Sequence, residues 1–317
     1  VMKVMITGAH GLLGQKLALA FGRETADALL LTDLAPRSFF MHERFDYQQL
    51  DITRLADVKS MVASFRPDVI INTAAMTNVD ACEEDRRASW QLNVDGVKNL
   101  LIPARRIEGC RLVQLSSDYV FDGRHAPYDE RSRPMPVSYY GRSKLAAENA
   151  VLSSHVDGAI VRTQVLYGTG FEVRMNFVSW VLAQLEKGLP FRVVNDQRGN
   201  PTMADDLAYG ILRIVEKDCR GIYHVSGPES IDRFSFARKI AEIFGFDPSL
   251  ISATTSREIG QGANRPPDSS FITLKFTSEC DAQMSDTTRG LERLRQQFRE
   301  GASHTDLLSD SRFLSFK

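Results

Sequence analysis

A serine, a tyrosine and a lysine are spaced so that they could move a proton together. Ser117 ends an apolar run, and Tyr140 and Lys144 lie four residues apart in a helical pattern. One helical turn places such a pair on the same face of a helix. A phenol has a pKa of about 10 in water, and a nearby cation favours its charged form. Lys144 would therefore make Tyr140 a better proton donor or acceptor near neutral pH, and Ser117 could hydrogen-bond the same substrate oxygen.

A tyrosine and a lysine at this spacing also occur by chance on many helices, so the surrounding elements must decide between catalysis and structure. Short runs rich in Val, Ile and Leu alternate with helical patterns. Continuously apolar runs are typical of strands covered on both faces. Repeated strand and helix predict an α/β fold with a Rossmann-type doubly wound parallel sheet. The predicted strands are Lys3–Thr7, Ala28–Thr32, Asp68–Asn72, Arg111–Leu115, Ala159–Arg162 and Gly221–Val225, and the predicted helices are Gln15–Phe21, Asp57–Phe65, Arg86–Arg106, Tyr139–Leu152 and Asp205–Val215.

The pattern loosens in the second half of the chain, where Gly and Pro separate shorter apolar segments. We predict a smaller α/β substrate-binding domain there, with one return of the chain to the main sheet. The predicted dinucleotide-binding domain spans residues 1–166 and 203–232, and the smaller domain spans 167–202 and 233–317. The tail after Glu300 has few apolar residues and is expected to be loosely held.

The chain opens with a strand, a glycine-rich turn and a helical pattern. Gly8, Gly11 and Gly14 are spaced three apart. Glycine is needed where a Cβ would block the turn, the approach of a pyrophosphate to backbone N–H groups, or helix–sheet packing. The pattern predicts a site for NADH or NADPH, although a purely structural turn uses the same glycines. Asp33 follows Gly14 by 19 residues, where an acid can accept hydrogen bonds from an adenosine ribose. A turn or helix-capping acid is the alternative for Asp33.

Small and polar residues extend the predicted cofactor site. Ala74 and Ala75 end the third strand and would let a flat cofactor lie across it, or would simply allow close packing. Asn93 is polar within a helical pattern and would either anchor a water chain or backbone carbonyl near the site or face solvent. The predicted cofactor-binding set also contains His10, Leu12, Leu13, Asp51, Ile52, Tyr140 and Lys144.

The composition excludes several other classes of protein. Lys and Arg total 39 and Asp and Glu total 40, so the net charge of -1 gives no field that would attract nucleic acid or an anionic membrane. No uncharged apolar run approaches the ~18 residues of a membrane span, and the first residues lack a signal-peptide pattern. We expect a cytoplasmic protein. The sequence leaves open whether it forms a homodimer. The four cysteines form no Cys-x-x-Cys pair, which predicts reduced thiols and no metal site.

Five segments carry a resemblance to a known family. The sequence resembles the extended short-chain dehydrogenase/reductase superfamily and, within it, the dTDP-4-dehydrorhamnose reductases. The first-half segments fix the superfamily, and the last two favour the reductase branch. These segments are Ile6–Gly14, Asn72–Asp80, Ser116–Gly123, Asp196–Thr202 and Asn264–Ser270.

The resemblance implies reduction of the C4 keto group of a nucleoside-diphosphate 4-keto-6-deoxy sugar by NADH or NADPH. It also implies that Ser117 and Tyr140 contact the substrate carbonyl and that Lys144 holds the nicotinamide ribose. A guanidinium can make two parallel hydrogen bonds to phosphate, so Arg265 is our candidate diphosphate ligand, with a surface or interdomain ion pair as the alternative. The implied substrate-binding residues are Thr77, Val79, Asp118, Val165, Asn200 and Arg265.

Two positions depart from the family pattern. Val165 replaces a tryptophan that many members have, so an aromatic wall beside the sugar nucleotide is absent. Asp268 stands where Asn is usual and places a negative charge near an anionic ligand. Ser117 is followed by Asp118 and Tyr119 rather than by the Asp-Glu pair of the related dehydratases, which favours reduction over elimination. An epimerase remains open, as does a non-catalytic regulatory subunit similar to that of methionine adenosyltransferase.

Overall fold

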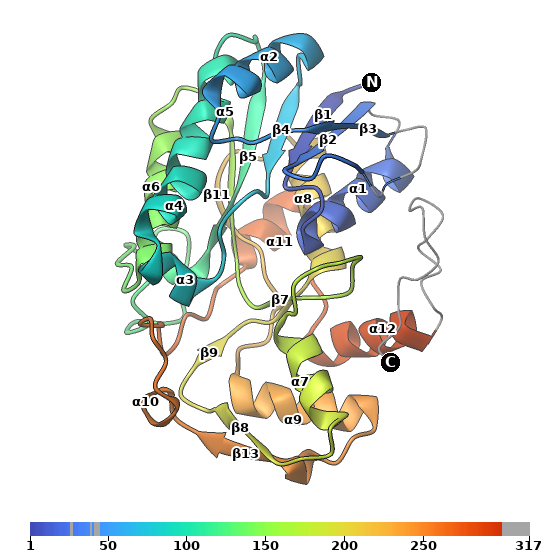
Figure 1. Ribbon diagram of the computed structural model, residues 1–317, viewed down its shortest axis with the longest axis vertical. Helices are drawn as coiled ribbons and strands as arrows, with labels where there is room; N and C mark the ends of the chain where they lie inside the picture. Colours follow the sequence, from blue (N-terminus) through green and yellow to red (C-terminus); the bar gives the residue numbers. More distant parts are fainter. Residues whose placement is uncertain (26–27, 39, 41–44, 300–317) are drawn as a thin grey trace.

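A seven-stranded parallel sheet forms the centre of the molecule (Figure 1). The computed structural model describes residues 1–25, 28–38, 40 and 45–299. All neighbouring strands of this sheet are parallel, in the order β11-β6-β5-β4-β1-β2-β3. The strands are β1 (Lys3–Thr7), β2 (Ala28–Asp33), β3 (Phe45–Gln49), β4 (Val69–Asn72), β5 (Arg111–Ser117), β6 (Gly158–Thr163) and β11 (Gly221–His224). The predicted doubly wound sheet is confirmed, including the late return of the chain through β11.

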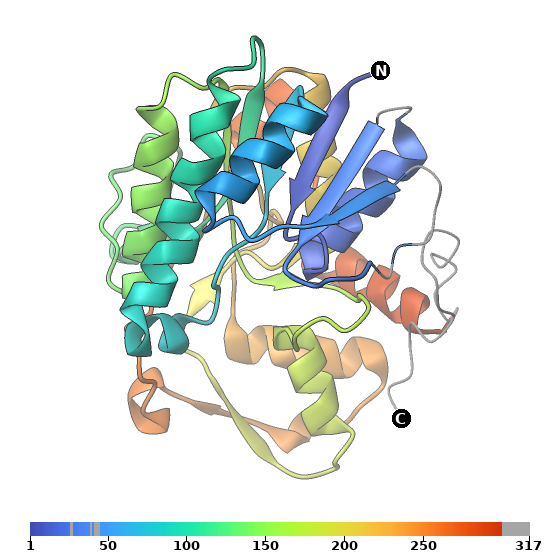
Figure 2. The same cartoon turned by 45° about the horizontal axis from the view of Figure 1, so that its top comes forward.

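Helices cover both faces of this sheet, which explains why its strands are continuously apolar. Val4 and Ile6 of β1 belong to one buried cluster, and Met5 between them belongs to another. Successive strand residues point to opposite faces, so each cluster fills one side. Figure 2 shows the two helical layers. The first cluster includes residues of α1 (Leu12–Glu24), α8 (Ala204–Glu216) and α11 (Leu274–Cys280), and the second includes residues of α2 (Leu55–Phe65), α5 (Gly96–Ala104) and α6 (Tyr139–Leu152).

The strand order reverses between β1 and β4, and a ligand crevice is expected at the carboxyl ends of two strands where the order reverses in this way. Polar side chains tie the strand ends together. The Thr7 hydroxyl donates to Asn72 Oδ1 at 2.6 Å, and the Asn72 amide donates to Gln114 Oε1 at 2.8 Å. The Thr73 hydroxyl donates to the Thr7 carbonyl at 2.7 Å. These bonds hold β1, β4 and β5 in register where a ligand would lie.

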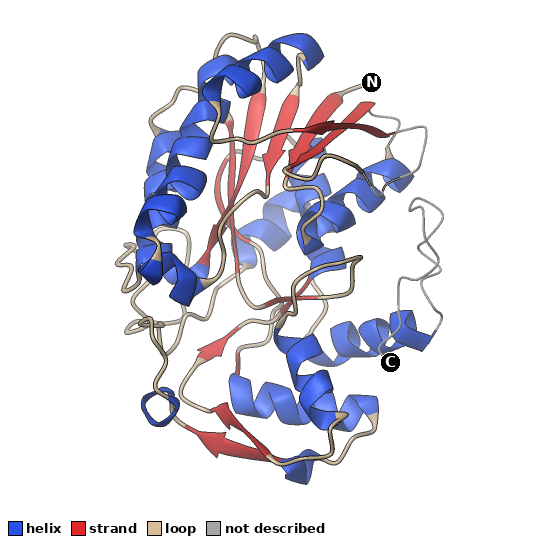
Figure 3. Cartoon of the chain, viewed as in Figure 1, coloured by secondary structure: helices blue, strands red, loops and turns tan. Residues whose placement is uncertain are grey.

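A third buried cluster lies beyond the carboxyl ends of the sheet (Figure 3). It is built around α7 (Phe177–Leu185), α9 (Arg233–Phe244) and α12 (Thr287–Arg299), with the strand pair β8 (Phe191–Val194) and β13 (Ile251–Thr254). The division into two domains stays a proposal. Residues of α11, which the sequence assigned to the smaller domain, belong to a buried cluster of the sheet. The remaining elements are α3 (Val79–Glu84), α4 (Arg86–Trp90), η1 (Gln91–Asp95), η2 (Asp118–Val120), β7 (Leu166–Tyr167), β9 (Arg198–Gly199), β10 (Thr202–Met203), β12 (Ile231–Asp232), η3 (Pro248–Leu250) and α10 (Ser256–Ile259).

Two differences from the predicted elements have physical causes. The helix predicted over Arg86–Arg106 is divided into α4, the π-helical turn η1 and α5. Strand β3 escaped prediction because it is an edge strand with only Phe45 and Tyr47 partly buried among exposed residues. The tail after Glu300, expected to be loosely held, lies outside the described residues. No helix in the described part of the chain is both long and apolar enough to cross a bilayer.

Candidate active site

The structure brings Ser117, Tyr140 and Lys144 together at the carboxyl end of β5. Ser117 is the last residue of β5, and α6 begins at Tyr139. The three side chains are largely enclosed, with exposed fractions of 6% for Ser117, 8% for Tyr140 and 3% for Lys144. Ser138 caps α6 by accepting a hydrogen bond from the Gly141 amide at 3.2 Å. The cap fixes where the helix starts and so fixes the position of Tyr140.

A glycine allows α6 to approach the segment after β5. A Cβ built on Gly141 would lie 2.1 Å from the Tyr119 carbonyl oxygen, so any larger residue would push the helix away. The close approach places the rings of Tyr119 and Tyr140 5.6 Å apart, with an angle of 72° between their planes. Tyr140 is thereby held edge-on against its neighbour beside Ser117.

Burial controls the protonation of this group. It raises the pKa of Tyr140, and a hydrogen bond between Tyr140 and Ser117 opposes the change. Burial also lowers the pKa of Lys144 to about 8, against the attraction of Glu148 and Cys82. The Lys144 ammonium donates to the Leu115 carbonyl at 2.6 Å. Our expectation that Lys144 would favour the charged form of Tyr140 is therefore wrong for the ligand-free protein, because burial dominates. Tyr140 keeps its proton at neutral pH.

The glycine turn between β1 and α1 has the shape that a pyrophosphate requires. Gly8 has φ +72°, and a Cβ there would lie 2.7 Å from the Ala74 amide nitrogen. A Cβ on Gly14 would lie 2.2 Å from the Gly8 carbonyl oxygen, so both glycines are needed for the turn itself. Gly11 differs, because it is exposed and a Cβ there would contact only the Gly8 oxygen, at 3.3 Å. Its small size leaves the start of α1 open, where backbone N–H groups bind anions.

Asp33 and His10 lie beside this turn. The Asp33 carboxylate accepts hydrogen bonds from the His10 amide at 2.9 Å and the Leu34 amide at 2.7 Å. The turn-forming role that the sequence left open for Asp33 is thus present. Asp33 remains partly exposed at the end of β2, so its contact with a ribose stays a prediction. The His10 ring stacks on Tyr47 with centroids 5.0 Å apart.

The other predicted cofactor residues differ in how accessible they are to a ligand. Ala74 and Ala75 are partly exposed after β4, at the crevice, whereas the Leu13 side chain is buried in the core. Asp51 accepts hydrogen bonds from the backbone and hydroxyl of Thr53. The remaining members of the predicted set are Leu12, which is partly buried at the start of α1, and Ile52, which is buried.

Asn93 connects the loop after β4 to the catalytic helix. It lies in the π-helical turn η1 and is 1% exposed, so the solvent-facing alternative is wrong. Its side chain accepts from the Met76 amide at 2.8 Å and donates to the Met76 carbonyl and the Ser143 hydroxyl, each at 3.0 Å. Ser143 in turn donates to the Tyr140 carbonyl at 2.7 Å. Asn93 therefore positions Tyr140, and π-helical turns often occur at such functional places.

The predicted substrate side begins with Asp118, which is buried beside Ser117. Its carboxylate accepts hydrogen bonds from the hydroxyls of Ser117 at 2.9 Å and Ser269 at 2.5 Å. Burial raises the pKa of Asp118, and these two hydrogen bonds and the attraction of Arg233 oppose the change. Asp118 therefore links the end of β5 to the segment that contains Ser269.

Asn200 and Val165 shape the wall of the same region. Asn200 is buried, donates to the Gly227 carbonyl at 2.9 Å and accepts from the Phe271 amide at 2.9 Å. Its side chain thus cross-links three segments. Val165 has φ +45°, a left-handed conformation that is rare for a β-branched residue and costs roughly 1–3 kcal/mol. Such strain tends to persist at functional sites.

Arg265 makes the ion pair that the sequence left open as an alternative. Its two terminal nitrogens contact the two oxygens of Asp80 at 2.7 and 3.2 Å. The contact joins the segment Asn264–Ser270 to α3. Of the predicted substrate residues there, Val79 is partly buried in α3 and Thr77 lies exposed just before the helix. Asp268 is held locally, because it accepts from the Ser270 amide and hydroxyl.

Sequence reasoning gave no roles to Asp80, Ser269 and Arg233, which the structure places around the predicted substrate residues. Ser269 bonds Asp118, Asp80 pairs with Arg265, and Arg233 interacts electrostatically with Asp118. Asp80 and Ser269 stood within the family-like segments. Arg233 carried no signal, since a cation at the start of a helix is usually solvated.

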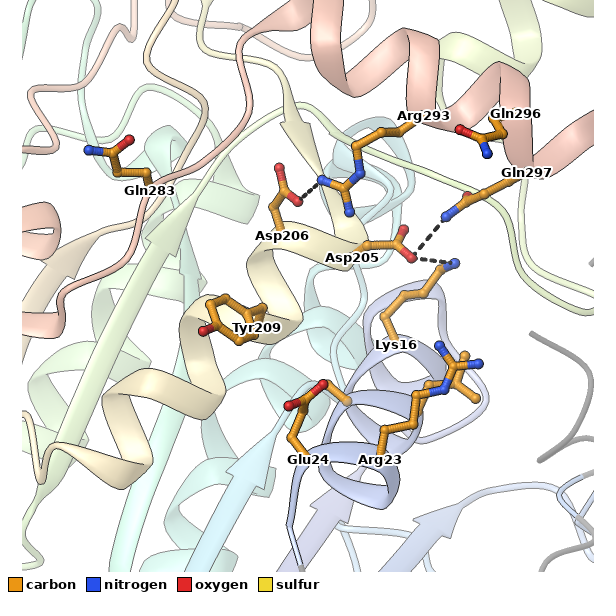
Figure 4. A pocket seen from close by; sticks show the side chains of 12 residues that line it. Lys16, Arg23, Glu24, Asp205, Asp206, Tyr209, Gln283, Arg293, Gln296 and Gln297 are labelled. Carbon is orange, nitrogen blue, oxygen red and sulfur yellow. Dashed lines mark hydrogen bonds and ion pairs between the residues drawn. The ribbon is translucent and has the colours of Figure 1, made fainter. Parts of the chain in front are cut away.

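A separate pocket of about 500 Å³ lies between α1, α8 and α12 (Figure 4). Four of its charged groups form two ion pairs: Lys16 lies 3.0 Å from Asp205, and Arg293 contacts Asp206. None of its lining residues belongs to the predicted catalytic, cofactor or substrate sets. We therefore assign this pocket no part in the chemistry considered above.

The chain is similar to several known proteins. A family model described as the RmlD substrate binding domain matches residues 2–300. A dTDP-4-dehydrorhamnose reductase of Mycobacterium tuberculosis is 34% identical over 281 residues, covering 86% of this chain and 84% of that protein. The beta subunit of methionine adenosyltransferase 2 from Danio rerio is 30% identical over 270 residues, covering 83% and 80%. The crystal structure of a Bacillus anthracis dTDP-4-dehydrorhamnose reductase in complex with NADP is 33% identical, with a TM-score of 0.80, and covers 93% of this chain and 99% of that one.

Proposed function

The chain belongs to the RmlD substrate binding domain family, and from this premise we propose that it is an NAD(P)H-dependent reductase. The proposed substrate is a nucleoside-diphosphate 4-keto-6-deoxy sugar, which is reduced at its C4 carbonyl. The observation that carries the proposal is the meeting of Ser117, Tyr140 and Lys144 at the end of β5, across the crevice from the open glycine turn. The proposed identity of the sugar rests on the names of the similar reductases.

The residues of the site have separate parts in this reaction. A bound nicotinamide would supply the hydride. The Tyr140 hydroxyl, which burial keeps protonated, donates its proton to the carbonyl oxygen as negative charge develops there. The Ser117 hydroxyl hydrogen-bonds the same oxygen and holds it beside Tyr140. The ammonium of Lys144, with a pKa of about 8, is charged at neutral pH and would bind the ribose hydroxyls of the cofactor.

The residues around the cofactor turn would hold NADH or NADPH without large rearrangement. Gly11 leaves the first N–H groups of α1 accessible to a pyrophosphate. Asp33 stands at the end of β2, where a ribose would lie, and its carboxylate oxygens have lone pairs beyond those used by His10 and Leu34. Ala74 and Ala75, with their small side chains, would let the flat nicotinamide half lie across the end of β4.

The proposal is tested by following the absorbance of NADH and NADPH with a deoxythymidine-diphosphate 4-keto-6-deoxy sugar. The expected result is oxidation of the cofactor that depends on the sugar, together with a 4-hydroxy product. A product epimerised without net oxidation would indicate an epimerase instead. Lack of turnover with every 4-keto nucleotide sugar would refute the reductase.

A second candidate rests on the similarity to the beta subunit of methionine adenosyltransferase 2. Such a chain would bind a dinucleotide and a partner enzyme without reducing a sugar. Tight binding to a methionine adenosyltransferase, measured by calorimetry together with absent sugar turnover, would favour this candidate.

A further inference from the structure

Arg233 lies at the edge of the predicted substrate region and forms no ion pair with any residue that the structure describes. It is the first residue of α9, and its backbone amide donates to the Gln197 carbonyl at 3.0 Å. Its side chain lies over the ring of Phe177, with 5.1 Å between the guanidinium carbon and the ring centroid. Across the described ranges 1–25, 28–38, 40 and 45–299, no hydrogen bond or ion pair reaches this guanidinium.

The guanidinium of Arg233 is enclosed, although the residue as a whole keeps partial exposure. Burial lowers the pKa of Arg233, and attraction to Tyr119 and Asp118 works against this change. Repulsion from Arg265 lowers the pKa further, so the two cations are close enough to interact. The residue nevertheless keeps partial exposure. A ligand entering the region could therefore contact it directly.

The two neighbouring carboxylates of the described chain make their direct contacts with groups other than Arg233. Asp80 is engaged by both terminal nitrogens of Arg265. Asp118 is engaged by the hydroxyls of Ser117 and Ser269, and burial raises its pKa. Enclosed charges normally have a partner, because an uncompensated charge away from water is costly. An anionic ligand would supply the ionic partner that the described residues do not give to Arg233.

We infer that Arg233 binds the diphosphate of the substrate, and this inference rests on the proposed function. A guanidinium suits phosphate oxygens because it can donate two parallel hydrogen bonds. Among the described residues the side-chain donors of Arg233 have no hydrogen-bond acceptor, whereas the donors of Arg265 are already shared with Asp80 and the Ala263 carbonyl. Arg233 therefore contributes more to diphosphate affinity than Arg265. The ion pair of Arg265 with Asp80 connects the segment Asn264–Ser270 to α3.

The test is calorimetric titration of the full chain with deoxythymidine diphosphate and with thymidine. The nicotinamide cofactor is present at saturation, so that the nucleotide cannot occupy the cofactor site. Arg233→Met should weaken diphosphate binding by about 10-fold to 100-fold, close to 1.4–2.7 kcal/mol, and should leave thymidine and cofactor binding unchanged. Arg233→Lys should recover part of the loss. The control is Arg238→Met, an exposed arginine on the same helix.

Two failures are distinguishable. If the wild-type protein binds no deoxythymidine diphosphate and turns over no nucleotide sugar, the proposed function fails. If the wild type binds the diphosphate and Arg233→Met binds it equally well, only the assignment of Arg233 fails. A larger loss in Arg265→Met than in Arg233→Met would also overturn the stated order of the two arginines.

An independent observation concerns two cysteines. Cys219 follows α8, Cys280 ends α11, and their sulfurs are 3.0 Å apart although 61 residues separate them in sequence. Cys219 is partly exposed and Cys280 is buried. Burial raises the pKa of Cys280. The sequence gave no sign of this pair, because the two residues are distant along the chain.

The geometry points to a disulfide site between Cys219 and Cys280, formed with a small-molecule disulfide such as oxidised glutathione as oxidant. The accessible Cys219 thiolate attacks one sulfur of glutathione disulfide and releases one glutathione. The Cys280 thiolate then attacks Cys219 Sγ and releases the second, so that two cysteines are oxidised and one glutathione disulfide is reduced to two thiols. The bond would tie α11, which follows the Asn264–Ser270 segment, to the turn between α8 and β11.

The test is intact-mass measurement and thermal unfolding of the full chain after incubation with oxidised glutathione. The expected result is a loss of about 2 Da and a rise of several degrees in the unfolding midpoint. Cys110→Ser should behave as the wild type, and Cys219→Ser should show no loss of mass. A wild-type protein that keeps four free thiols, or that accumulates only a glutathione adduct, would overturn the proposal.

Discussion

Replacing Lys144 with methionine should stabilise the ligand-free protein while removing its activity. The lysine is 3% exposed, and burial lowers its pKa from 10.5 to about 8 against the opposing attraction of Glu148 and Cys82. A difference of about 2.5 between the two pKa values corresponds to roughly 3 kcal/mol. Near neutral pH the folded protein therefore carries a charged lysine at that cost in stability.

The variant avoids the cost of burying the charged lysine, but part of this gain in stability is offset. The hydrogen bond from Lys144 to the Leu115 carbonyl is lost, a change worth about 1–2 kcal/mol. The carbonyl keeps a donor, because the Gln114 side-chain amide contacts it at 2.8 Å. Methionine also fills much of the space of the lysine stem. We expect the free energy of unfolding to rise by about 1–2 kcal/mol.

The pH dependence identifies the cause. Because the folded pKa of Lys144 lies below its unfolded value, the destabilisation is complete below about pH 8 and fades as the pH rises toward 10.5. The difference in stability between Lys144→Met and the wild type should fade over the same interval. Urea unfolding of the ligand-free protein at several pH values measures it, with the exposed Lys98→Met as control. A variant less stable than wild type by more than about 1 kcal/mol at neutral pH, or a difference independent of pH, would refute the reasoning.

Three further predictions concern other parts of the site. NADH should bind at least as tightly as NADPH, because Asp33 would repel a 2′-phosphate; calorimetry showing a preference for NADPH of about tenfold or more would contradict this role. Gly141→Ala should lower kcat at least about tenfold and destabilise the fold by about 1–3 kcal/mol, because its Cβ would meet the Tyr119 carbonyl oxygen; unchanged kinetics and an unchanged thermal midpoint would count against it. Glu148→Gln should cost about 3–5 kcal/mol in urea unfolding, because it leaves the buried Arg162 without its charged partner; a loss below about 1 kcal/mol would argue against the pair.

The sequence was informative wherever function depends on local spacing. Continuous apolar runs predicted six of the seven strands of the sheet because both faces are buried. The interval of four residues between Tyr140 and Lys144, together with the strand end at Ser117, predicted a group that the fold brings together. These features are visible in a sequence because each depends on residues within one element.

Long-range contacts were out of reach for the same reason. Arg265 and Asp80 are 185 residues apart, and no periodicity links them. Arg233 reads as a solvated helix residue until α9 is placed beside the end of β5. The effect of Lys144 on Tyr140 was judged from spacing alone, whereas the extent of burial, which reverses the direction of the pKa change, depends on the whole fold.

The central claim is that Tyr140 is the proton donor for reduction of a sugar carbonyl. The most direct measurement compares kcat and cofactor affinity of Tyr140→Phe with those of the wild type. We predict that kcat falls by roughly 10²–10⁴-fold, the usual contribution of a general acid, while the dissociation constant of the nicotinamide cofactor stays nearly unchanged. A Tyr140→Phe variant that turns over the sugar nucleotide at the wild-type rate would contradict the account.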